Sequence, residues 1–331
     1  MLNNKSILIT GGTGSLGQAL TSRILKKYKK IKKLIILSRD EFKQFTMQQT
    51  FSDKKYKCMR YFLGDVRDLD RLNQAFKGVD YVIHAAALKQ VPSAEYNPSE
   101  YIKTNVFGAQ NVISASINQN IKKVVALSTD KACSPINLYG ASKLCSDKLF
   151  ISSNNYSGKN GTSFSVVRYG NVFASRGSVI PYFLELNKQK KPITITDNQM
   201  TRFNISIDEG VDAVLWSLKN LIGSEILVPK IKSFKIIDLA YSINPKSKIK
   251  IIGIRPGEKI HEELISKADG ELSIDIGKYY LILPNKGFFK KYKNYKELRK
   301  NFLYRSDLNK QFLSRRELKK LVEKKKINSV F

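Results

Sequence analysis

The sequence predicts an α/β protein: a doubly wound parallel Rossmann sheet with a smaller C-terminal α/β lobe. Up to about residue 168, short apolar runs alternate with helical patterns. This alternation is typical of parallel strands joined by right-handed helical crossovers. The first run also leads into a glycine-rich turn and a helix, and the length of 331 residues leaves room for a second lobe.

The first apolar run, residues 6–9, and the turn after it predict a dinucleotide-binding site. Strand, glycine turn and helix follow one another here, and this context makes the motif credible. Gly11 permits the tight turn, Gly14 lets the backbone approach a pyrophosphate, and Gly17 allows close helix packing. The helix N-terminus supplies amide donors and a favourable dipole for the anion. The expected cofactor residues of this turn are Gly11, Thr13, Gly14, Ser15, Leu16 and Gly17.

The second run, residues 34–37, bears on the choice between NAD and NADP. It ends in Ser38, Arg39 and Asp40. An acid at this strand tip would hydrogen-bond a free ribose hydroxyl, whereas an arginine accommodates a 2′-phosphate. Because Ser38 and Arg39 precede Asp40, NADP is favoured over NAD; the alternative is that Arg39 is one more solvated base. Lys43 completes the cofactor contacts expected at this strand end.

The third and fourth runs, residues 61–63 and 81–84, are expected to border the rest of the cofactor. An acid and a valine follow the third run, where an adenine edge could rest. Three alanines follow the fourth run, and their small side chains leave room for the cofactor backbone. A lysine beyond them could contact the nicotinamide ribose and a sugar, although a surface lysine is the simpler alternative. These residues are Asp65, Val66, Ala85, Ala86, Ala87 and Lys89.

The fifth run, residues 123–127, leads into the most reactive side chains of the sequence. Ligands of open α/β sheets bind at the carboxyl ends of the strands. Tyr139 and Lys143 are four residues apart, so on a helix they share a face and the ammonium can stabilise a tyrosinate. The alternative for the acid before Lys131 is a helix cap near Asn137, with the lysine as its ion-pair partner. The expected catalytic residues are Thr129, Asp130, Lys131, Tyr139 and Lys143, with Ser128 as an alternative to Thr129.

The sixth run, residues 163–167, ends the regular alternation, and after it the chain is expected to pass between lobes. Residues 1–170 are assigned to the nucleotide-binding domain. It is completed by about 206–225, where acids at the start of a helix complement the helix dipole. Residues 171–285 are assigned mainly to the second lobe. The basic, aromatic and poorly periodic segment 286–331 has no assigned role.

The charge of the chain is unusual, because 58 Lys and Arg face 28 Asp and Glu, a formal net charge of +30. Three interpretations compete: a nucleic-acid surface, a field that attracts an anionic ligand, and a bias toward solvated lysines. The lysines are dispersed, without aromatic interleaving and without a nucleic-acid motif. No specific nucleic-acid partner is therefore expected.

The remaining composition is that of a globular protein, with 42% hydrophobic residues. The 3 cysteines make no disulfide framework, so cytosolic thiols are expected. No apolar run approaches the roughly 18 residues that a membrane-spanning helix needs. A cytoplasmic protein with no membrane span and no metal site is therefore expected.

Longer motifs carry a resemblance to a known family. They are TGGTGSLG, SRDEFKQ, MRYFLGDVRD, HAAALKQVPSAEYNP, KTNVFGAQNVI, ALSTDKA, NLYGASKL, VVRYGNVFASRGSV, MTRFNI, IRPGEKIHE and YRSDLNKQFLSRREL. Through these motifs, which run almost end to end, the chain resembles the extended short-chain dehydrogenase/reductase superfamily. Within it, the chain is most similar to the inverting UDP-N-acetylglucosamine 4,6-dehydratases that begin pseudaminic acid synthesis. Relatives that retain the C5 configuration typically carry an acid where Lys131 stands.

The resemblance implies an NADP-dependent hydro-lyase that removes water across C5–C6 of UDP-N-acetylglucosamine, giving a UDP-4-keto-6-deoxy-L-hexosamine inverted at C5. C4 is oxidised first, water leaves, and the hydride returns to C6. Tyr139 would take the O4 proton, and the resemblance assigns the C5 base to Lys131 and the C6 acid to Asp130. A C5 base must be neutral, so the pKa of Lys131 is expected to fall toward the working pH, with Asp130 sharing one proton.

Other classes stay open beside this one. A retaining UDP-sugar 4,6-dehydratase or a UDP-sugar 4-epimerase would use the same fold, and an epimerase needs no pair like Asp130 and Lys131. The third class is a non-enzymatic Rossmann regulator with a nucleic-acid surface. Loss of the pair Tyr139 and Lys143 would favour that class, and the pair is intact. For the favoured class, a homo-oligomer is expected.

The resemblance also assigns contacts to the substrate. A guanidinium fork matches phosphate oxygens, so Arg202 and Arg255 suit the diphosphate. Glu258 could accept hydrogen bonds from the uridine ribose, and Tyr169 and Asn171 are expected to face the sugar. The full set of expected substrate residues is Lys89, Tyr169, Asn171, Val172, Arg202, Arg255 and Glu258.

Three positions depart from the pattern of the family. The family usually has His where Gln90 stands, Asn where Ser134 stands, and an aromatic residue where Asn204 stands. Gln90 and Ser134 keep the capacity to form hydrogen bonds. Asn204 loses apolar surface near Arg202, which bears on substrate packing or on contacts between subunits.

Overall fold

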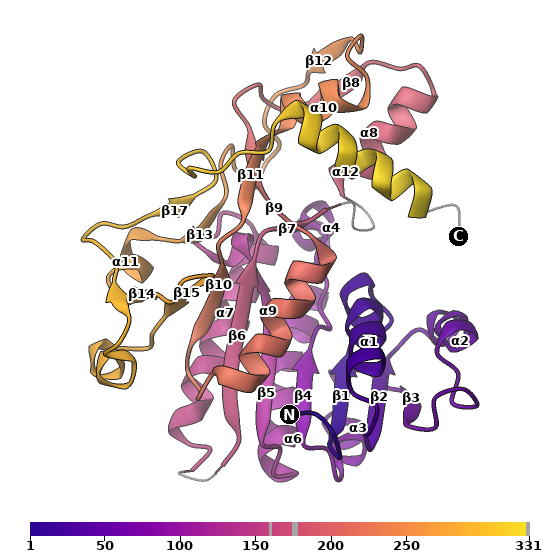
Figure 1. The fold of residues 1–331 in the computed structure, drawn as a ribbon, viewed down its shortest axis with the longest axis vertical. Coiled ribbons are helices and arrows are strands. Elements are labelled where there is room, and N and C mark those ends of the chain that lie inside the picture. Colours follow the sequence, from indigo (N-terminus) through magenta and orange to yellow (C-terminus); the bar gives the residue numbers. More distant parts are fainter. Residues whose placement is uncertain (159–160, 174–177, 329–331) are drawn as a thin grey trace.

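The computed structural model describes residues 1–158, 161–173 and 178–328. Within these residues the main sheet has ten strands, in the order β16-β14-β15-β10-β6-β5-β4-β1-β2-β3 (Figure 1). Every pairing from β10 to β3 is parallel, which confirms the predicted doubly wound sheet. The parallel strands are β1 (Ser6–Thr10), β2 (Lys33–Ser38), β3 (Met59–Leu63), β4 (Tyr81–His84), β5 (Lys123–Thr129), β6 (Ser163–Tyr169) and β10 (Ile226–Pro229).

Helices cover both faces of this sheet (Figure 1). On one face α1 packs against α9, and on the other α6 contacts both α3 and α7. Strands covered on both faces need no polar face, and all five residues of β1 are buried. These helices are α1 (Ser15–Lys27), α3 (Leu69–Phe76), α6 (Gly108–Asn118), α7 (Leu138–Ser152) and α9 (Ile207–Asn220).

The predicted helix with an acidic start is confirmed as α9. Ser206 and Glu209 form a capping box, in which each side chain bonds the backbone N–H of the other. Shorter elements complete this part of the chain: α2 (Glu41–Thr50), α4 (Val91–Tyr96), α5 (Pro98–Tyr101), the π-helix η1 (Ile102–Phe107) and the 3-10 turns η2 (Asp130–Ala132) and η3 (Ser153–Asn155).

A second lobe lies beyond the carboxyl ends of the parallel strands, at the top of Figure 1. It contains a three-stranded sheet, β11-β9-β7, and the pair β12-β8. Its strands are β7 (Asn171–Val172), β8 (Ile193–Ile195), β9 (Thr201–Ile205), β11 (Lys232–Lys235) and β12 (Ile249–Ile251), and its helices are α8 (Val179–Lys188), α10 (Ile236–Ile243) and α12 (Arg315–Asn328). The lobe has its own hydrophobic cluster, which includes Ile180, Phe183, Ile195, Phe234, Leu239, Leu318 and Val322.

The C-terminal segment, which had no role in the sequence analysis, ties the two lobes together. Its helix α12 packs on α10 of the second lobe, and its strand β17 (Tyr304–Arg305) pairs with β13 (Glu263–Ile265). Its strand β16 (Lys296–Glu297) extends the antiparallel edge of the main sheet beyond β15 (Tyr279–Ile282) and β14 (Ser273–Asp275). The remaining elements are α11 (Lys267–Gly270) and the 3-10 turn η4 (Lys286–Tyr292).

The domain boundaries drawn from the sequence stay a prediction. Two strands of the part assigned mainly to the second lobe, β14 and β15, extend the main sheet. They reach it because β15 pairs antiparallel with β10, the last parallel strand. Residues 174–177 of one family motif and residues 329–331 of the basic C-terminal segment lie outside the described residues.

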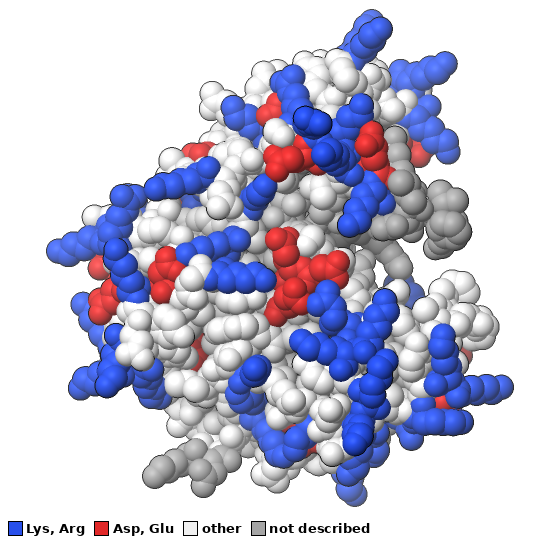
Figure 2. Space-filling view, viewed as in Figure 1, with Lys and Arg blue, Asp and Glu red and all other residues white. Residues whose placement is uncertain are grey.

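The surface carries the positive charge in a dispersed form. In Figure 2, lysines and arginines are spread over both lobes and acidic side chains gather in smaller groups between them. The three cysteines, Cys58, Cys133 and Cys145, are free thiols. Among the described residues, no helix is both long and apolar enough to cross a membrane.

Candidate active site

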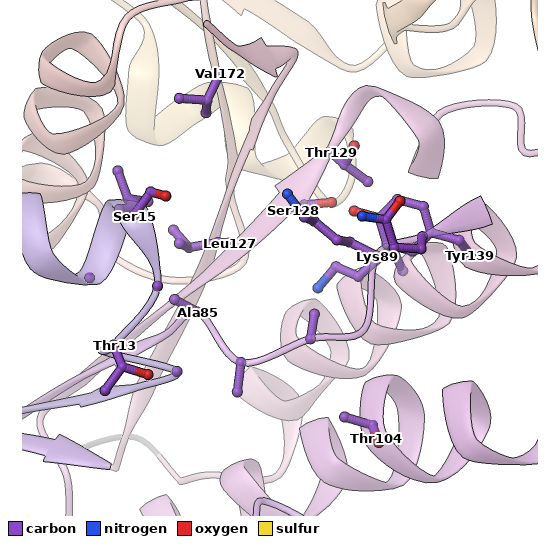
Figure 3. Close-up of a pocket in the computed structure, with 18 of the residues that line it drawn as sticks. Thr13, Ser15, Ala85, Lys89, Thr104, Leu127, Ser128, Thr129, Tyr139 and Val172 are labelled. Carbon is purple, nitrogen blue, oxygen red and sulfur yellow. The ribbon is translucent and has the colours of Figure 1, made fainter. Parts of the chain in front are cut away.

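A cavity of about 730 Å³ opens at the carboxyl ends of the parallel strands. Figure 3 shows Thr13 and Ser15 of the glycine turn on one side of it and Ser128, Thr129 and Tyr139 on the other. The predicted cofactor residues that line it are Gly11, Thr13, Gly14, Ser15, Leu16, Gly17, Ser38, Arg39, Asp40, Lys43, Val66, Ala85, Ala86, Ala87, Lys89, Tyr139 and Lys143. Asp65 does not line the cavity, because its carboxylate faces Arg67 and Arg39.

The glycine turn has the shape that a dinucleotide site needs. Gly11 has a φ of +64°, and a Cβ there would lie 2.8 Å from the backbone of Ala86. A Cβ on Gly17 would lie 2.3 Å from the carbonyl oxygen of Gly12, so α1 can start close to the turn only with glycine there. Gly14 caps α1 without a side chain, which leaves the first amides of the helix to an anion. These residues fit the pyrophosphate of a nicotinamide dinucleotide.

At the end of β2 the structure separates the roles of Arg39 and Asp40. The carboxylate of Asp40 caps α2, accepting the backbone N–H of Lys43 at 2.9 Å, and it pairs with Lys43 Nζ at 2.6 Å. Arg39 is 47% exposed at the cavity rim, and its Nη1 lies 3.5 Å from Asp65 Oδ2. The acid is therefore engaged at its own helix, whereas the guanidinium stands beside the cavity. The preference for NADP over NAD stays a prediction.

Tyr139 and Lys143 lie buried on α7, with Tyr139 hydrogen-bonded to Thr129. Burial raises the pKa of Tyr139 to about 12, against the opposing charge of Lys131. Burial also lowers the pKa of Lys143, against the charge of Asp147. In the chain alone the phenol is therefore neutral at physiological pH. A tyrosinate beside the positive nicotinamide stays a prediction.

Two residues that the sequence analysis missed, Asp147 and Arg168, form a buried network behind this pair. Asp147 Oδ2 accepts the hydroxyl of Ser128 at 2.7 Å and lies 3.3 Å from Arg168 Nη2. Arg168 Nη1 reaches Asp269 Oδ2 at 2.9 Å. Ser128 lines the cavity and donates its hydroxyl proton to Asp147. Thr129, the hydroxyl bonded to Tyr139, donates in turn to Asp130 Oδ1 at 3.0 Å. The four-residue spacing from Lys143 to Asp147 was the available signal.

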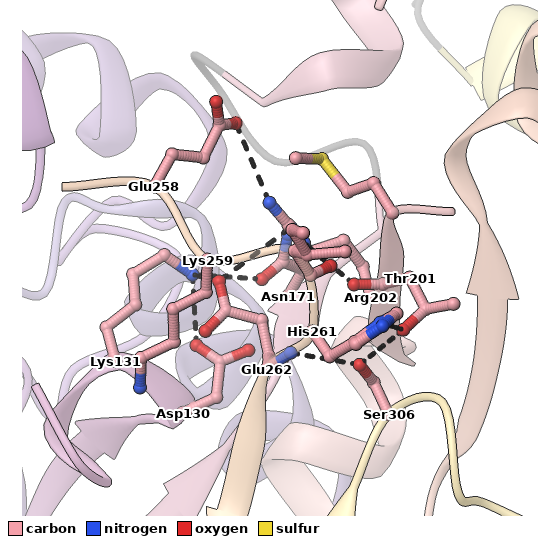
Figure 4. Close-up of polar contacts among 12 residues, drawn as sticks. Asp130, Lys131, Asn171, Thr201, Arg202, Glu258, Lys259, His261, Glu262 and Ser306 are labelled. Atoms are coloured by element: carbon pink, nitrogen blue, oxygen red, sulfur yellow. Dashed lines mark hydrogen bonds and ion pairs between the residues drawn. The ribbon is translucent and has the colours of Figure 1, made fainter. Parts of the chain in front are cut away.

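Lys131 stands between two carboxylates rather than one (Figure 4). Its Nζ lies 3.0 Å from Asp130 Oδ1, 3.1 Å from Glu262 Oε1 and 3.4 Å from Asn171 Oδ1. Burial by itself lowers the pKa of Lys131, but the charges of Asp130 and Glu262 outweigh burial and raise it. For the chain alone the direction is therefore opposite to the expected one, because Asp130 first and Glu262 second oppose burial. The expected fall with sugar and cofactor bound stays a prediction.

The capping alternative for Asp130 is excluded by the start of α7. Asn137 caps that helix, accepting the backbone N–H of Gly140 at 2.8 Å. Asp130 is 0% exposed and lines neither of the two cavities described here, and its Oδ2 has no hydrogen-bond partner in the described part of the chain. Asp130 is thus buried behind Lys131, which lines both cavities.

A second cavity of about 470 Å³ adjoins the first in the direction of the second lobe. The predicted substrate residues divide between the two: Lys89, Tyr169 and Val172 line the first, Arg202, Arg255 and Glu258 line the second, and Asn171 lines both. Arg202 Nη2 lies 3.6 Å from Glu258 Oε1, and Arg202 Nε lies 3.7 Å from Glu262 Oε1. Glu262 was missed, although it ends the motif that contains Arg255 and Glu258.

The three departures from the family pattern have distinct surroundings. Ser134 adopts a φ of +46°, and its hydroxyl donates to Glu263 Oε2 at 3.0 Å. The side-chain carbonyl of Asn204 is buried, with no hydrogen-bond partner among residues 1–158, 161–173 and 178–328. The backbone carbonyl of Gln90 accepts the hydroxyl of Tyr101 at 2.7 Å, at the edge of the first cavity.

Comparisons with known proteins agree with this geometry. A family model described as "Polysaccharide biosynthesis protein" matches residues 7–284. A UDP-N-acetylglucosamine 4,6-dehydratase (inverting) of Campylobacter jejuni is 51% identical over 97% of this chain and 98% of its own. A UDP-glucose 4-epimerase of Rickettsia akari is 46% identical over 85% of this chain and 84% of its own. The X-ray structure of Pen from Bacillus thuringiensis superposes with a TM-score of 0.90, at 37% identity and 99% coverage of both chains. These similarities confirm the resemblance carried by the motifs.

Proposed function

We propose that this chain, which belongs to the polysaccharide biosynthesis protein family, is an inverting UDP-N-acetylglucosamine 4,6-dehydratase that uses NADP. The observation that carries the proposal is the position of Lys131. It lines both cavities, with Tyr139 and Lys143 in the wall of the first and the expected diphosphate residues in the wall of the second. A relative of that name, 51% identical over nearly the whole chain, supports the choice of reaction.

The cofactor would be held by the glycine turn and the start of α1. Gly11, Gly14 and Gly17 give its pyrophosphate room, and Arg39 would meet the 2′-phosphate of NADP. When bound, the nicotinamide supplies reversible storage of the hydride taken from C4. Lys143, buried beside the cavity, would orient the nicotinamide ribose and favour loss of the Tyr139 proton.

The proton transfers can be assigned to three side chains. Tyr139, with Thr129 hydrogen-bonded to it, would take the proton of the C4 hydroxyl. The resulting ketone makes the C5 proton acidic, and Lys131 would remove that proton. The resemblance assigns protonation of the departing C6 hydroxyl to Asp130, which lies behind Lys131 and outside both cavities in the chain alone. Return of a proton to C5 on the opposite face would give the inverted UDP-4-keto-6-deoxy-L-hexosamine.

The substrate would span the two cavities. Asn171 lines both, so the hexose is proposed to lie against it and Tyr169, near Lys89 and Val172. Arg202 and Arg255 would meet the diphosphate, since a guanidinium matches phosphate oxygens better than an ammonium does. Glu258 Oε1 lies 3.6 Å from Arg202 Nη2. With substrate bound, the Glu258 carboxylate would accept hydrogen bonds from the ribose hydroxyls in place of part of its contact with Arg202.

A second candidate is a UDP-sugar 4-epimerase, which the name of a relative at 46% identity favours. That reaction needs Tyr139 and the cofactor but leaves the C5 proton in place. The pair Asp130 and Lys131 would then have no proton to move. The resemblance further supports a hydro-lyase that acts in the cytoplasm as a homo-oligomer in polysaccharide or pseudaminic acid synthesis.

One experiment separates these candidates. The protein is incubated with NADP and UDP-N-acetylglucosamine in heavy water, and the product is read by NMR. We expect a C6 methyl group, deuterium at C5 and inverted C5 configuration. A C4 epimer without deuterium at C5 would identify an epimerase, and retained C5 configuration would identify a retaining dehydratase. Lys131→Ala is the matched control, expected to stop elimination while C4 oxidation remains measurable.

A further inference from the structure

Glu262, like Asp147, is an acidic residue near the site that the sequence did not mark, and it contacts Lys131 directly. It lies just before β13, and its backbone is fixed on both sides by the C-terminal segment. The N–H of Glu262 donates to Ser306 Oγ at 3.0 Å, and the N–H of Ser306 donates to the carbonyl of Glu262 at 2.8 Å. The side chain is 3% exposed and lines the second cavity.

The carboxylate of Glu262 is shared by two cations. Its Oε1 lies 3.1 Å from Lys131 Nζ and 3.7 Å from Arg202 Nε (Figure 4). Its other oxygen, Oε2, is buried and has no hydrogen-bond partner in the described part of the chain. Asp130, by contrast, meets only one of the two cations, Lys131, and is fully buried. A buried carboxylate is costly unless it is paired.

We propose that Glu262 is a positioning residue of the reaction, which acts through its neighbours by holding Lys131 as an ammonium ion and Asp130 as a neutral acid. The assignment rests on the proposed function. It also follows from the pairing, because Glu262 lies near two cations, Lys131 and Arg202, whereas Asp130 contacts only Lys131 among the cations of the described residues and otherwise accepts the hydroxyl of Thr129 at 3.0 Å.

The titration of the two acids agrees with this division. Burial raises the pKa of Asp130, and the charge of Glu262 raises it further, while Lys131 opposes both. Burial also raises the pKa of Glu262, but Lys131 and Arg202 outweigh burial and the net direction is downward. The two pKa values therefore shift in opposite directions, so of the two acids Asp130 is the one that holds a proton more readily. A protonated Asp130 is the form that can give a proton to the leaving C6 hydroxyl.

The contact between Glu262 and Lys131 also accounts for how the ammonium becomes a base. A sugar over Lys131 and the positive charge of a bound nicotinamide would both lower the pKa of the ammonium, which favours transfer of one proton from Lys131 Nζ to Glu262 Oε1. The transfer leaves both side chains neutral and conserves the net charge. Lys131 then takes up the C5 proton, and Asp130 gives its own proton to the C6 hydroxyl, which leaves as water. At the end of the step Lys131 is again an ammonium, Asp130 is ionised and Glu262 is neutral.

Several other charged or titratable groups act on this cluster, and each stays in place in the variants below. Those acting on Lys131 include Arg202, Tyr139 and Lys89, and those acting on Glu262 or Arg202 include Lys259 and Glu258. Removing the charge of Glu262 leaves Asp130 as the one carboxylate that contacts Lys131 in the described residues. The pKa of Lys131 and the pKa of Asp130 should then both fall, since the charge of Glu262 raises each of them.

The first test measures Lys131 directly and needs no turnover. Reductive methylation modifies only the neutral amine. The rate at which Lys131 is methylated is therefore followed by peptide mass spectrometry at pH values from about 7 to about 10, below and near the ordinary pKa of lysine. In Glu262→Gln we expect Lys131 to be labelled about tenfold faster at a given pH, or more, which corresponds to a pKa lower by one unit. Equal labelling of the variant and the unmutated chain would overturn the proposal.

Two further variants control this measurement. Glu263→Gln removes the neighbouring carboxylate, which accepts from Ser134 and does not touch Lys131, so labelling should not change. Glu262→Asp keeps the charge and should label like the unmutated chain. If Glu262→Gln fails to fold, the same comparison is made with Glu262→Met, which also removes the charge. Faster labelling of Lys131 than in the unmutated chain is expected there, and an equal rate contradicts the proposal.

The second test uses the reaction. In Glu262→Gln we expect transient reduction of the nicotinamide to persist. Deuterium uptake at C5 should fall by about a hundredfold, the usual contribution of a positioned proton-transfer group, because Lys131 Nζ loses the carboxylate that orients it at 3.1 Å. The pH optimum of C5 exchange should move to lower pH, and Glu262→Asp should restore part of the rate. If the unmutated protein exchanges no C5 proton, the proposed function fails, and the labelling result still decides the role of Glu262. Loss of C4 oxidation together with C5 exchange would mean a merely structural role.

Discussion

At the scale of single residues, Tyr139 is proposed to act in the first redox step. Replacing it with phenylalanine keeps the ring, which packs with Ala94 and Tyr101, but removes the group that would take the C4 hydroxyl proton. We expect Tyr139→Phe to lower turnover by about a thousandfold, within the range of general base catalysis, with unchanged NADP binding. The measurement is the transient absorbance of reduced nicotinamide on mixing with substrate. Near-normal turnover would remove Tyr139 from the mechanism.

Arg39 is the residue proposed to decide the choice of cofactor. It is 47% exposed, and its ion pair in the described part of the chain is with Asp65, 3.5 Å away at the cavity rim, so its guanidinium is accessible to a 2′-phosphate. We expect Arg39→Ala to weaken NADP binding by about 1.5–3 kcal/mol, the value of a hydrogen bond to a charged group, and to leave NAD binding unchanged. Fluorescence titration of both cofactors measures this, with Arg60→Ala as a control on the neighbouring strand β3. Equal affinity of the unmutated chain for NAD and NADP would refute the argument.

How far the sequence predicts the site depends on the separation between partners along the chain. Tyr139, Lys143 and Lys131 follow one strand, and local spacing is enough to group them. Glu262 meets Lys131 from 131 residues further along, and nothing local marks it among the 28 acids of the chain. In the chain alone, its charge adds to that of Asp130 in raising the pKa of Lys131.

At the scale of elements, the strand ends are set by pairing rather than by apolar runs. The run 123–127 predicts the core of β5, but the strand continues through Ser128 and Thr129, which pair with Arg168 and Tyr169 of β6. These four residues are polar or only partly apolar, so hydrophobic pattern alone ends both strands two residues early. The backbone pairing brings Thr129 next to Tyr169 and places both at the cavity.

In the turn between β5 and α7, the backbone of Ser134 is strained, and a substitution can relieve this strain. Its φ of +46° lies in the left-handed region, where asparagine is tolerated better than serine. We expect Ser134→Asn to raise the free energy of unfolding by up to about 1 kcal/mol, since part of the left-handed penalty is removed. Denaturant unfolding measures the change. Ser134→Ala, which loses the bond to Glu263, should be less stable than the unmutated chain, and an asparagine variant no better than alanine would contradict the interpretation.

At the scale of the whole molecule, the parallel sheet is predictable and the course of the C-terminal segment is not. The sheet repeats a local pattern of apolar runs and helices, and each of these elements can be recognised from its own residues. Helix α12 is mostly charged, and its few apolar residues, among them Leu318 and Val322, are buried only because α10 lies opposite. Segments whose burial depends on a distant partner give no periodic signal of their own.

The stability of the second lobe is therefore expected to depend on α12, whereas the stability of the nucleotide-binding sheet is not expected to depend on it. Leu318 is 0% exposed within the cluster of the second lobe. Replacing it with alanine removes buried methyl groups and leaves a cavity, at a cost of about 2–5 kcal/mol. Because that cluster is separate from the core of the main sheet, we expect the loss to appear first in α8, α10 and the pair β8–β12.

Hydrogen exchange and ligand binding are two independent measurements of this prediction. In Leu318→Ala the amides of α10 and β8 should lose protection while those of β1 and β5 keep it, since local opening follows cooperative units. UDP-N-acetylglucosamine should bind more weakly, because the second cavity is built from Ile195, Ile236 and their neighbours, whereas NADP affinity should stay the same. Lys320→Ala, an exposed change on the same helix, should alter neither. Equal loss of protection in both lobes, or of affinity for both ligands, would mean that the two clusters unfold as one unit and that α12 stabilises the whole chain.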